Sequence, residues 1–173
     1  MRVMEEKERI MMKDKPKLFI PVGMPGCGKS TFYEENFTEK NVKYVSRDRI
    51  RFNMIDNEQD YFAHENEVYH EYIKTIVASL KSGINVYADA THINHASRAK
   101  LVKALRKCGV GEEEYSIIFI FFDVSLHTCI ERNNNRKGLA KVPEDIIIKM
   151  KTNIAKPTFE EFINILDIWT VSV

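Results

Sequence analysis

The sequence predicts an α/β fold in which a central, mainly parallel sheet of five strands is covered by helices on both faces. First, apolar strand-like segments alternate with helix-like segments along the 173 residues, which is typical of parallel sheets with covering helices. Second, the clearest strand candidates are almost wholly apolar, as expected for strands buried on both faces. Third, polar residues gather directly after several strands, and the carboxyl ends of parallel strands meet at one edge of a sheet, where ligands bind.

Five segments have the character of strands. The clearest is nearly all apolar and is expected to be a fully buried central strand. In chain order the five predicted strands are Lys17–Val22, Val42–Val45, Ile84–Ala88, Tyr115–Phe122 and Ile168–Val173.

Helical patterns occupy most of the remaining chain. Apolar residues at four-residue steps predict a helix over Glu65–Lys81, which ends at Ser82 and Gly83. Asn94 and Ser125 are expected to be N-caps, because their side chains can accept hydrogen bonds from the first turn of a helix. The other predicted helices are Thr31–Phe37, Asn94–Lys107, Ser125–Asn133, Pro143–Ile154 with its proline in the first turn, and a short helical turn over Pro157–Phe162.

Length and charge predict one domain over residues 16–173, preceded by a charged leader over residues 1–15 that is either disordered or helical. No apolar run approaches the roughly 20 residues of a membrane span, and the leader lacks the apolar segment of a secretory signal. The three cysteines have neither a metal-ligand spacing nor an even number for disulfides. We therefore expect a cytoplasmic protein with no membrane partner.

A phosphate-binding loop is predicted between the first strand and the helix that follows it. Gly23–Ser30 has the pattern G-x-x-x-x-G-K-S, and its strand–loop–helix context favours a P-loop over a glycine-rich turn without a ligand. Lys29 would place a positive charge at the phosphates of ATP or another NTP, and Ser30 would supply an oxygen to Mg²⁺. The predicted nucleotide-binding residues of the loop are Gly23, Gly26, Cys27, Gly28, Lys29, Ser30 and Thr31.

The residues after the second predicted strand are strongly charged. They include three arginines and one acid between Ser46 and Arg51. Asp48 is the candidate general base, since a carboxylate opposite a P-loop can accept the proton of an attacking hydroxyl. Arg47 and Arg51 are candidates for binding a phosphate-bearing acceptor, because guanidinium groups match phosphate oxygens. The alternative is a surface cluster of ion pairs at a helix start.

A second polar group follows the third predicted strand. Asp89 could orient the Mg²⁺ shell through water, and Thr91 and His92 could contact the acceptor. The alternative for Asp89 is an acid of a turn.

Basic residues also stand between two predicted helices, over Arg132–Gly138. Arg132 and Arg136 are four residues apart and could reach a bound nucleotide from a lid, where they would neutralise charge on the transferring phosphoryl group. The alternative is a solvated basic loop. With the P-loop, these arginines predict a P-loop NTPase-type, three-layer α/β/α fold with an arginine-bearing lid. The chain lacks the Asn-Lys-x-Asp and Asp-x-x-Gly segments of a GTPase, which favours a small phosphotransferase.

In these blocks the chain resembles the 5′-kinase domain of the phage polynucleotide kinases. The resemblance runs from about Lys17 to about Met150. It rests on four blocks in the same order: the P-loop through Thr31, Ser46-Arg47-Asp48 with Arg51, Asp89-Ala90-Thr91-His92 leading to Arg98, and Arg132-Asn133 with Arg136 leading to Val142-Pro143. The chain departs from the family at Arg49, where an acid often follows the Arg-Asp pair.

The resemblance implies roles for residues in each block. Lys29 and Ser30 would bind the phosphates of ATP and Mg²⁺, and Asp48 would be the base for a 5′-hydroxyl. Arg51 would hold the phosphate on the 3′ side of the acceptor nucleotide. Arg136 would stabilise the transition state, with Arg132 near the adenine or the phosphates. The family domain usually sits beside a 3′-phosphatase or ligase domain, so a separate phosphatase or ligase is an expected partner.

Taken together, the residues and the resemblance predict transfer of the γ-phosphate of ATP to the 5′-hydroxyl of a DNA or RNA end. Lys29, Asp48 and Arg136 are the predicted catalytic residues. The net charge of +1 argues against a protein that coats nucleic acid, so the nucleic-acid contact is expected at a small local site. A small-molecule or nucleotide-sugar kinase and an ATP-binding regulatory module without transfer remain alternatives. DNA versus RNA preference and the oligomeric state are open.

Overall fold

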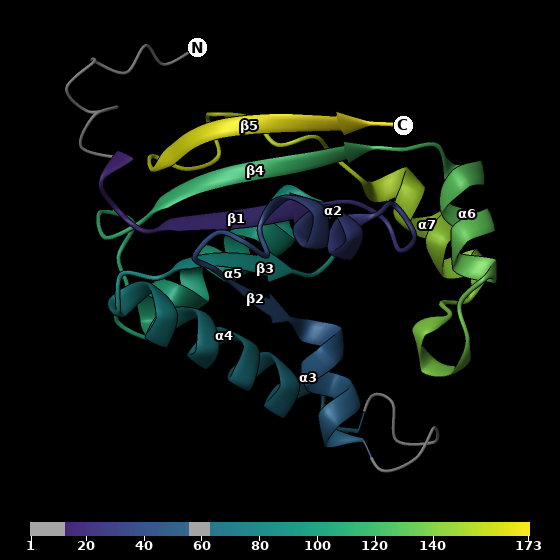
Figure 1. The fold of residues 1–173 in the computed structure, drawn as a ribbon, viewed down its shortest axis with the longest axis horizontal. Coiled ribbons are helices and arrows are strands. Elements are labelled where there is room, and N and C mark those ends of the chain that lie inside the picture. Colours follow the sequence, from purple (N-terminus) through teal and green to yellow (C-terminus); the bar gives the residue numbers. More distant parts are fainter. Residues whose placement is uncertain (1–12, 56–62) are drawn as a thin grey trace.

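The computed structural model describes residues 13–55 and 63–173, and most of the predicted leader lies outside them. It contains a five-stranded sheet in the order β2-β3-β1-β4-β5, and every adjacent pair of strands is parallel. The predicted fold class is confirmed. The strands are β1 (Lys17–Val22), β2 (Val42–Ser46), β3 (Asn85–Asp89), β4 (Ser116–Asp123) and β5 (Ile165–Ser172). Figure 1 shows their carboxyl ends at one side of the molecule.

Helices connect the strands, and the sequence patterns predicted the main ones but not the helix over Arg47–Met54. The two N-caps are confirmed, since Asn94 forms a capping box with Ser97 and Ser125 accepts a hydrogen bond from the Thr128 amide. Pro143 occupies the N-cap position of the helix after the basic loop. The helices are α2 (Lys29–Asn36), α3 (Arg47–Met54), α4 (Glu65–Lys81), α5 (His95–Lys107), α6 (Leu126–Asn134), the 3₁₀ turn η2 (Gly138–Ala140) and α7 (Glu144–Asn153).

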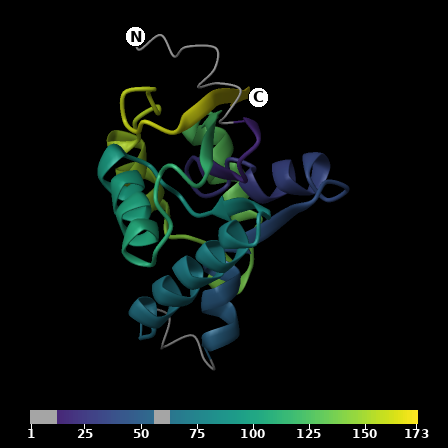
Figure 2. The same ribbon diagram turned by 90° about the vertical axis from the view of Figure 1, so that its left-hand side faces the viewer.

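The core has two halves, one on each face of the sheet. Because side chains alternate along a strand, Leu18 and Ile20 of β1 pack with α4 and α5, whereas Phe19 packs on the opposite face. That second face is covered by α2, α6 and α7, with Cys129 and Ile147 buried against it. Figure 2 shows α4 and α5 on one side of the sheet and α2 on the other. The molecule therefore has three layers.

Over Pro157–Phe162 the chain makes one hydrogen-bonded turn, in which the Glu161 amide donates to the Thr158 carbonyl oxygen at 3.2 Å. The predicted start of the last strand was wrong, because β5 begins at Ile165 rather than at Ile168. Asp167 interrupts the apolar run and so hid the start of this strand. In the structure Asp167 sits on the outer strand of the sheet, where its carboxylate accepts hydrogen bonds from the Ile168 amide and the Trp169 indole. Among the described residues, no helix combines the length and apolar character needed to cross a membrane.

Candidate active site

The predicted P-loop joins β1 to α2 and has the backbone that its glycines predict. Gly26 and Gly28 have φ angles of 83° and 104°, in the left-handed region that residues with a Cβ rarely adopt. A Cβ on Gly26 would also lie 2.4 Å from the Cys129 carbonyl oxygen on α6. The loop can therefore pass close under α6 only because residue 26 is glycine.

Lys29 is held at the centre of this loop. Its ammonium group donates hydrogen bonds to the Gly23 and Met24 carbonyl oxygens, both at 3.0 Å. Its own carbonyl oxygen accepts a hydrogen bond from the Tyr87 hydroxyl at 2.8 Å, which ties the start of α2 to β3. These contacts keep the charge of Lys29 at the carboxyl edge of the sheet.

A pocket of about 630 Å³ opens beside the loop, within the usual size of small-ligand sites. The predicted nucleotide-binding residues that line it are Gly26, Cys27, Gly28, Ser30, Thr31, Arg132 and Arg136. Sequence reasoning missed Glu35 of α2, Val171 of β5 and Val173, which follows β5, all of which also line it. Helical spacing from Thr31 could have found Glu35, but only the sheet order brings β5 to this pocket.

The basic loop that carries Arg136 is closed at its base by one side chain. The fully buried Asn133 amide donates to the Val142 carbonyl oxygen at 2.7 Å and accepts from the Val142 amide at 3.0 Å. Between these residues the loop forms η2, and Arg136 donates to the Ala140 carbonyl oxygen at 3.4 Å. Arg136 thus stands on a loop with a fixed base, whereas Arg132, predicted for the same loop, lies in the last turn of α6, and both arginines line the P-loop pocket.

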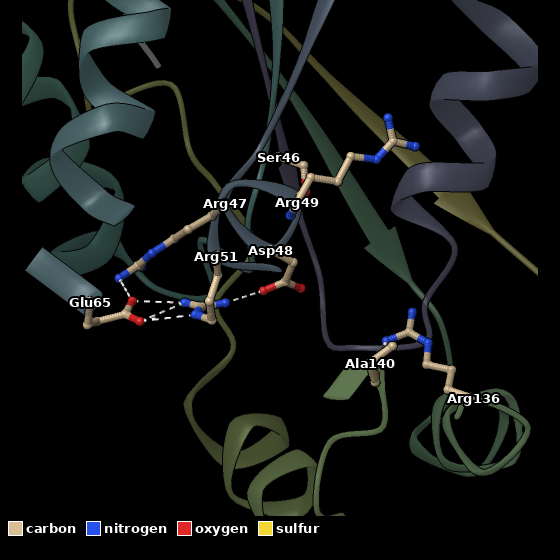
Figure 3. Close-up of polar contacts among 8 residues, drawn as sticks. All are labelled: Ser46, Arg47, Asp48, Arg49, Arg51, Glu65, Arg136 and Ala140. Carbon is tan, nitrogen blue, oxygen red and sulfur yellow. Dashed lines mark hydrogen bonds and ion pairs between the residues drawn. The ribbon is translucent and has the colours of Figure 1, made fainter. Parts of the chain in front are cut away.

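Asp48 lies in the first turn of α3, which is capped by Ser46. Its side chain is 64% exposed and forms an ion pair with Arg51 one turn along the helix. Glu65, at the start of α4, binds the same guanidinium group through Nε at 3.1 Å and Nη2 at 2.9 Å. Figure 3 shows the resulting row of Glu65, Arg51 and Asp48, with the Asp48 carboxylate at its open end.

In this row Arg47 and Arg51 both have acidic partners within the protein. The Arg51 side chain is only 7% exposed and is bound by two carboxylates, and Arg47 is also paired with Glu65. Two guanidinium groups near a sheet edge need counter-charges. Glu65, which is 14 residues beyond Arg51 in the sequence, supplies a negative charge to both arginines. In this arrangement Arg51 joins Asp48 to Glu65, and the contact of Arg51 with an acceptor phosphate stays a prediction. Glu65 was missed because its sequence position indicated only the start of a helix.

Asp89, at the end of β3, connects the candidate residues electrostatically. It accepts a hydrogen bond of 2.5 Å from the Tyr44 hydroxyl. Burial raises the pKa of the Asp89 carboxyl above its ordinary value, opposed by the Lys29 ammonium group, and Asp48 and Arg136 also act on it. β3 pairs with both β1 and β2, so Asp89 lies at the same edge of the sheet as Lys29, at the start of α2, and Asp48, in the first turn of α3. The predicted charged residues therefore do gather at one edge of the sheet.

The next loop gives Thr91 and His92 different surroundings. Thr91 is half-buried, and its carbonyl oxygen accepts a hydrogen bond from the Gly23 amide at 3.1 Å, which joins this loop to the P-loop. His92 is more enclosed than Thr91, and its contact with an acceptor stays a prediction. Its ring is buried, with Nε2 at 3.1 Å from both the Tyr72 hydroxyl and the Ala88 carbonyl oxygen. It is a core histidine that fixes the turn after β3.

The buried His92 predicts that stability falls in mild acid. Burial lowers the pKa of His92 to about 3, whereas in the unfolded chain it is near 6.5. The unfolded state therefore binds a proton below about pH 6.5 that the folded state excludes. Stability present above that pH is lost as the pH falls toward 3, with a slope of up to about 1.4 kcal/mol per pH unit.

Urea unfolding between pH 7 and pH 4 measures this loss, with His92→Asn as the comparison because asparagine tolerates the positive φ at this position. We expect a shallower pH slope in the variant. Equal slopes in the two proteins would show that His92 does not carry the effect. The exposed His127 provides a matched control, and His127→Asn should keep the wild-type slope.

The residues at the loop fit a nucleotide with its magnesium ion. The left-handed glycines and the charge of Lys29 suit an anionic phosphate group. Ser30 offers a hydroxyl oxygen, and Asp89 offers a carboxylate that Tyr44 holds in place. Magnesium prefers such oxygen ligands in combination with water and substrate phosphates.

Known proteins share this architecture. A chain in the Pnkp1/Rnl/Hen1 RNA repair complex is 30% identical with a TM-score of 0.65, over 80% of this chain and 44% of that one. This protein thus spans less than half of that relative. A fungal RNA kinase (14% identity, TM-score 0.62, 91% and 74% covered) and a gluconokinase from Sinorhizobium meliloti (15%, 0.52, 91% and 83%) share the fold.

A family described as an AAA domain matches residues 18–157. The matched range begins in β1 and contains the P-loop, the charged start of α3, the Asp89 loop and the basic loop. The chain therefore belongs to this AAA domain family and forms a P-loop domain of the polynucleotide-kinase-like type.

Proposed function

We propose that the protein transfers the γ-phosphoryl group of ATP to the 5′-hydroxyl of a DNA or RNA end. One observation carries the proposal: the Asp48 carboxylate is exposed and paired with Arg51 at the same edge of the sheet as Lys29, and Arg136 lines the pocket beside the P-loop. A base, a phosphate-binding cation and a lid cation around one point are the requirements of in-line phosphoryl transfer.

In the proposed reaction, the acceptor hydroxyl oxygen attacks the γ-phosphorus of ATP. The bond from that phosphorus to the β–γ bridging oxygen breaks, and ADP leaves. Asp48 accepts the hydroxyl proton, Lys29 offsets charge on the β- and γ-phosphates, and Arg136 offsets charge on the transferring group. Magnesium, bound by Ser30 and through water by Asp89, would neutralise phosphate charge. Most of the rate enhancement would come from positioning and charge.

The present contact of Arg136 supports the role that we propose for it. Its hydrogen bond to the Ala140 carbonyl oxygen is long, at 3.4 Å, and lies within its own loop. A phosphate would be a stronger partner for a guanidinium group than a neutral carbonyl. Nucleotide binding would then turn Arg136 from its loop toward the phosphates, with Arg132 beside it on the pocket wall.

The relatives support the nucleic-acid acceptor. The similar chain at 30% identity belongs to an assembly described as an RNA repair complex, and a fungal RNA kinase has the same fold. A repair role would require other enzymes to prepare or seal the ends, so we include a separate phosphatase or ligase among the proposed partners.

An end-labelling assay tests the function. Purified protein, ATP labelled at the γ-phosphate and Mg²⁺ are incubated with 5′-hydroxyl oligonucleotides, nucleosides or sugars. We expect label on DNA or RNA 5′ ends, and none with Lys29→Ala. Label on a sugar or nucleoside alone would instead support a small-molecule kinase. ATP hydrolysis without transfer, or no turnover, would support an ATP-binding module.

Glu65 is expected to act on this reaction through Asp48. Glu65→Gln removes the counter-charge that holds Arg51 against Asp48. We expect kcat to fall by about ten- to hundredfold, as small losses of orientation do, with KM for ATP unchanged. Steady-state kinetics measures both. Glu67→Gln, at an exposed position on the same helix, is the matched control, and a wild-type kcat in Glu65→Gln would refute the positioning role.

A further inference from the structure

Arg49 differs from the two arginines that flank it in the sequence. Its guanidinium carbon lies 4.5 Å from the centroid of the Tyr44 ring, and within residues 13–55 and 63–173 it makes no ion pair. Its side chain is exposed. Figure 3 shows it leaving α3 on the side away from Arg51 and Glu65. Arg49 is thus the member of this arginine cluster that keeps its charge available.

The Tyr44 ring holds Arg49 beside the candidate active site. The Tyr44 hydroxyl donates to Asp89, and its ring packs on Tyr33 of α2 with centroids 4.6 Å apart. The ring is therefore fixed at both its edge and its face. When a guanidinium group stacks on an aromatic ring, the flat face of the guanidinium group contacts the ring and its N–H groups stay free to donate hydrogen bonds. Those N–H groups match the oxygens of a phosphate.

Tyr44 and Arg49 also line a hollow of about 320 Å³ at the edge of the sheet. It lies between β2, α3 and α4, and Asn53 and Thr75 form part of its wall. Because β2 is an outer strand, the hollow lies at the rim of the sheet, and Arg49, the neighbour of Asp48 in α3, forms part of its wall. An extended acceptor could leave the site along this hollow.

We propose that Arg49 binds a backbone phosphate of the acceptor strand, on the Tyr44 side of Asp48. The inference rests on the proposed function and adds to it a residue that selects acceptors with a phosphate backbone. Arg51 and Arg47, which the sequence suggested for this contact, are engaged by Glu65, whereas Arg49 has the free charge, the fixed position and the adjoining hollow.

The salt dependence of acceptor use tests this contact. Transfer to a 5′-hydroxyl pentanucleotide is measured at saturating ATP over a range of salt concentrations. Each phosphate contact to a single strand adds about 0.7 to the slope of log affinity against log salt. In Arg49→Ala we expect KM for the oligonucleotide to rise about tenfold, the slope of log(1/KM) to become shallower by about 0.7 and kcat to change little. Arg49→Lys should retain the wild-type slope.

Lys43→Ala is the matched control, because it removes an exposed β2 cation from the strand face opposite Tyr44. It should leave the slope unchanged, and KM for ATP should be the same in all variants. If Arg49→Ala keeps the wild-type slope and KM while the wild type labels the oligonucleotide, the Arg49 contact is refuted and the kinase function stands. If the wild type labels no oligonucleotide, the proposed kinase function is refuted, and the Arg49 contact, which depends on that function, is refuted as well.

Discussion

Asp48→Asn is expected to lower kcat for transfer to a 5′-hydroxyl end by about a hundredfold or more. Asparagine has nearly the same shape as aspartate but cannot take the proton of the attacking hydroxyl. The P-loop is untouched, so ATP binding should change little. Initial rates with γ-labelled ATP and an oligonucleotide measure kcat, and equilibrium titration with a fluorescent ATP analogue measures nucleotide binding.

A matched control separates the loss of this base from the loss of any acid at the same edge. Asp123 ends β4 at the carboxyl edge of the sheet and is exposed, so Asp123→Asn removes one negative charge outside the row of Glu65, Arg51 and Asp48. We expect near wild-type rates in that variant. A wild-type kcat in Asp48→Asn would show that Asp48 is not the general base. The site would then be supported only as a nucleotide-binding pocket.

Arg98→Met is expected to destabilise the fold by about 3–5 kcal/mol, the usual cost of leaving a buried charge without its partner. Arg98 is fully buried, and its Nε and Nη2 donate to the two Glu161 carboxylate oxygens at 2.8 and 2.5 Å. Its Nη1 donates to the His92 and Ala155 carbonyl oxygens. The pair thus fastens the segment after α7 to the loop that follows β3. Urea unfolding at pH 7 measures the change.

Two further variants make the prediction specific to the buried pair. Arg98→Met combined with Glu161→Met should recover part of the loss, because the double variant buries no unpaired charge. Arg106 lies on the same helix in an exposed pair with Glu112, with its side chain 63% exposed, and Arg106→Met should cost less than about 1 kcal/mol. Equal losses for Arg98→Met and Arg106→Met would contradict a structural role for the buried pair.

Local patterns in the sequence were sufficient to predict the parallel α/β fold, the P-loop and the edge at which the charged residues meet. Strand and helix periods depend on neighbouring residues, as for Glu65–Lys81, whose bounds were predicted correctly. Gly26 and Gly28 adopt positive φ angles that residues with a Cβ rarely adopt, so the loop could be predicted from the positions of its glycines. Parallel strands place their carboxyl ends together, so residues after separate strands, such as Lys29 and Asp89, could be assigned to one site without a structure.

Tertiary packing alone decided which charge each side chain meets. Glu65 pairs with Arg51 across 14 residues and Glu161 with Arg98 across 63, and only the packing of α4 against α3, and of the segment after α7 against α5, makes these contacts. The same packing turns His92 into the core and leaves Arg49 on Tyr44. A buried charge needs a partner, and the fold determines which residue that partner is. The sequence therefore identified the charged residues but did not show which of them stabilise the fold and which are available for catalysis or binding.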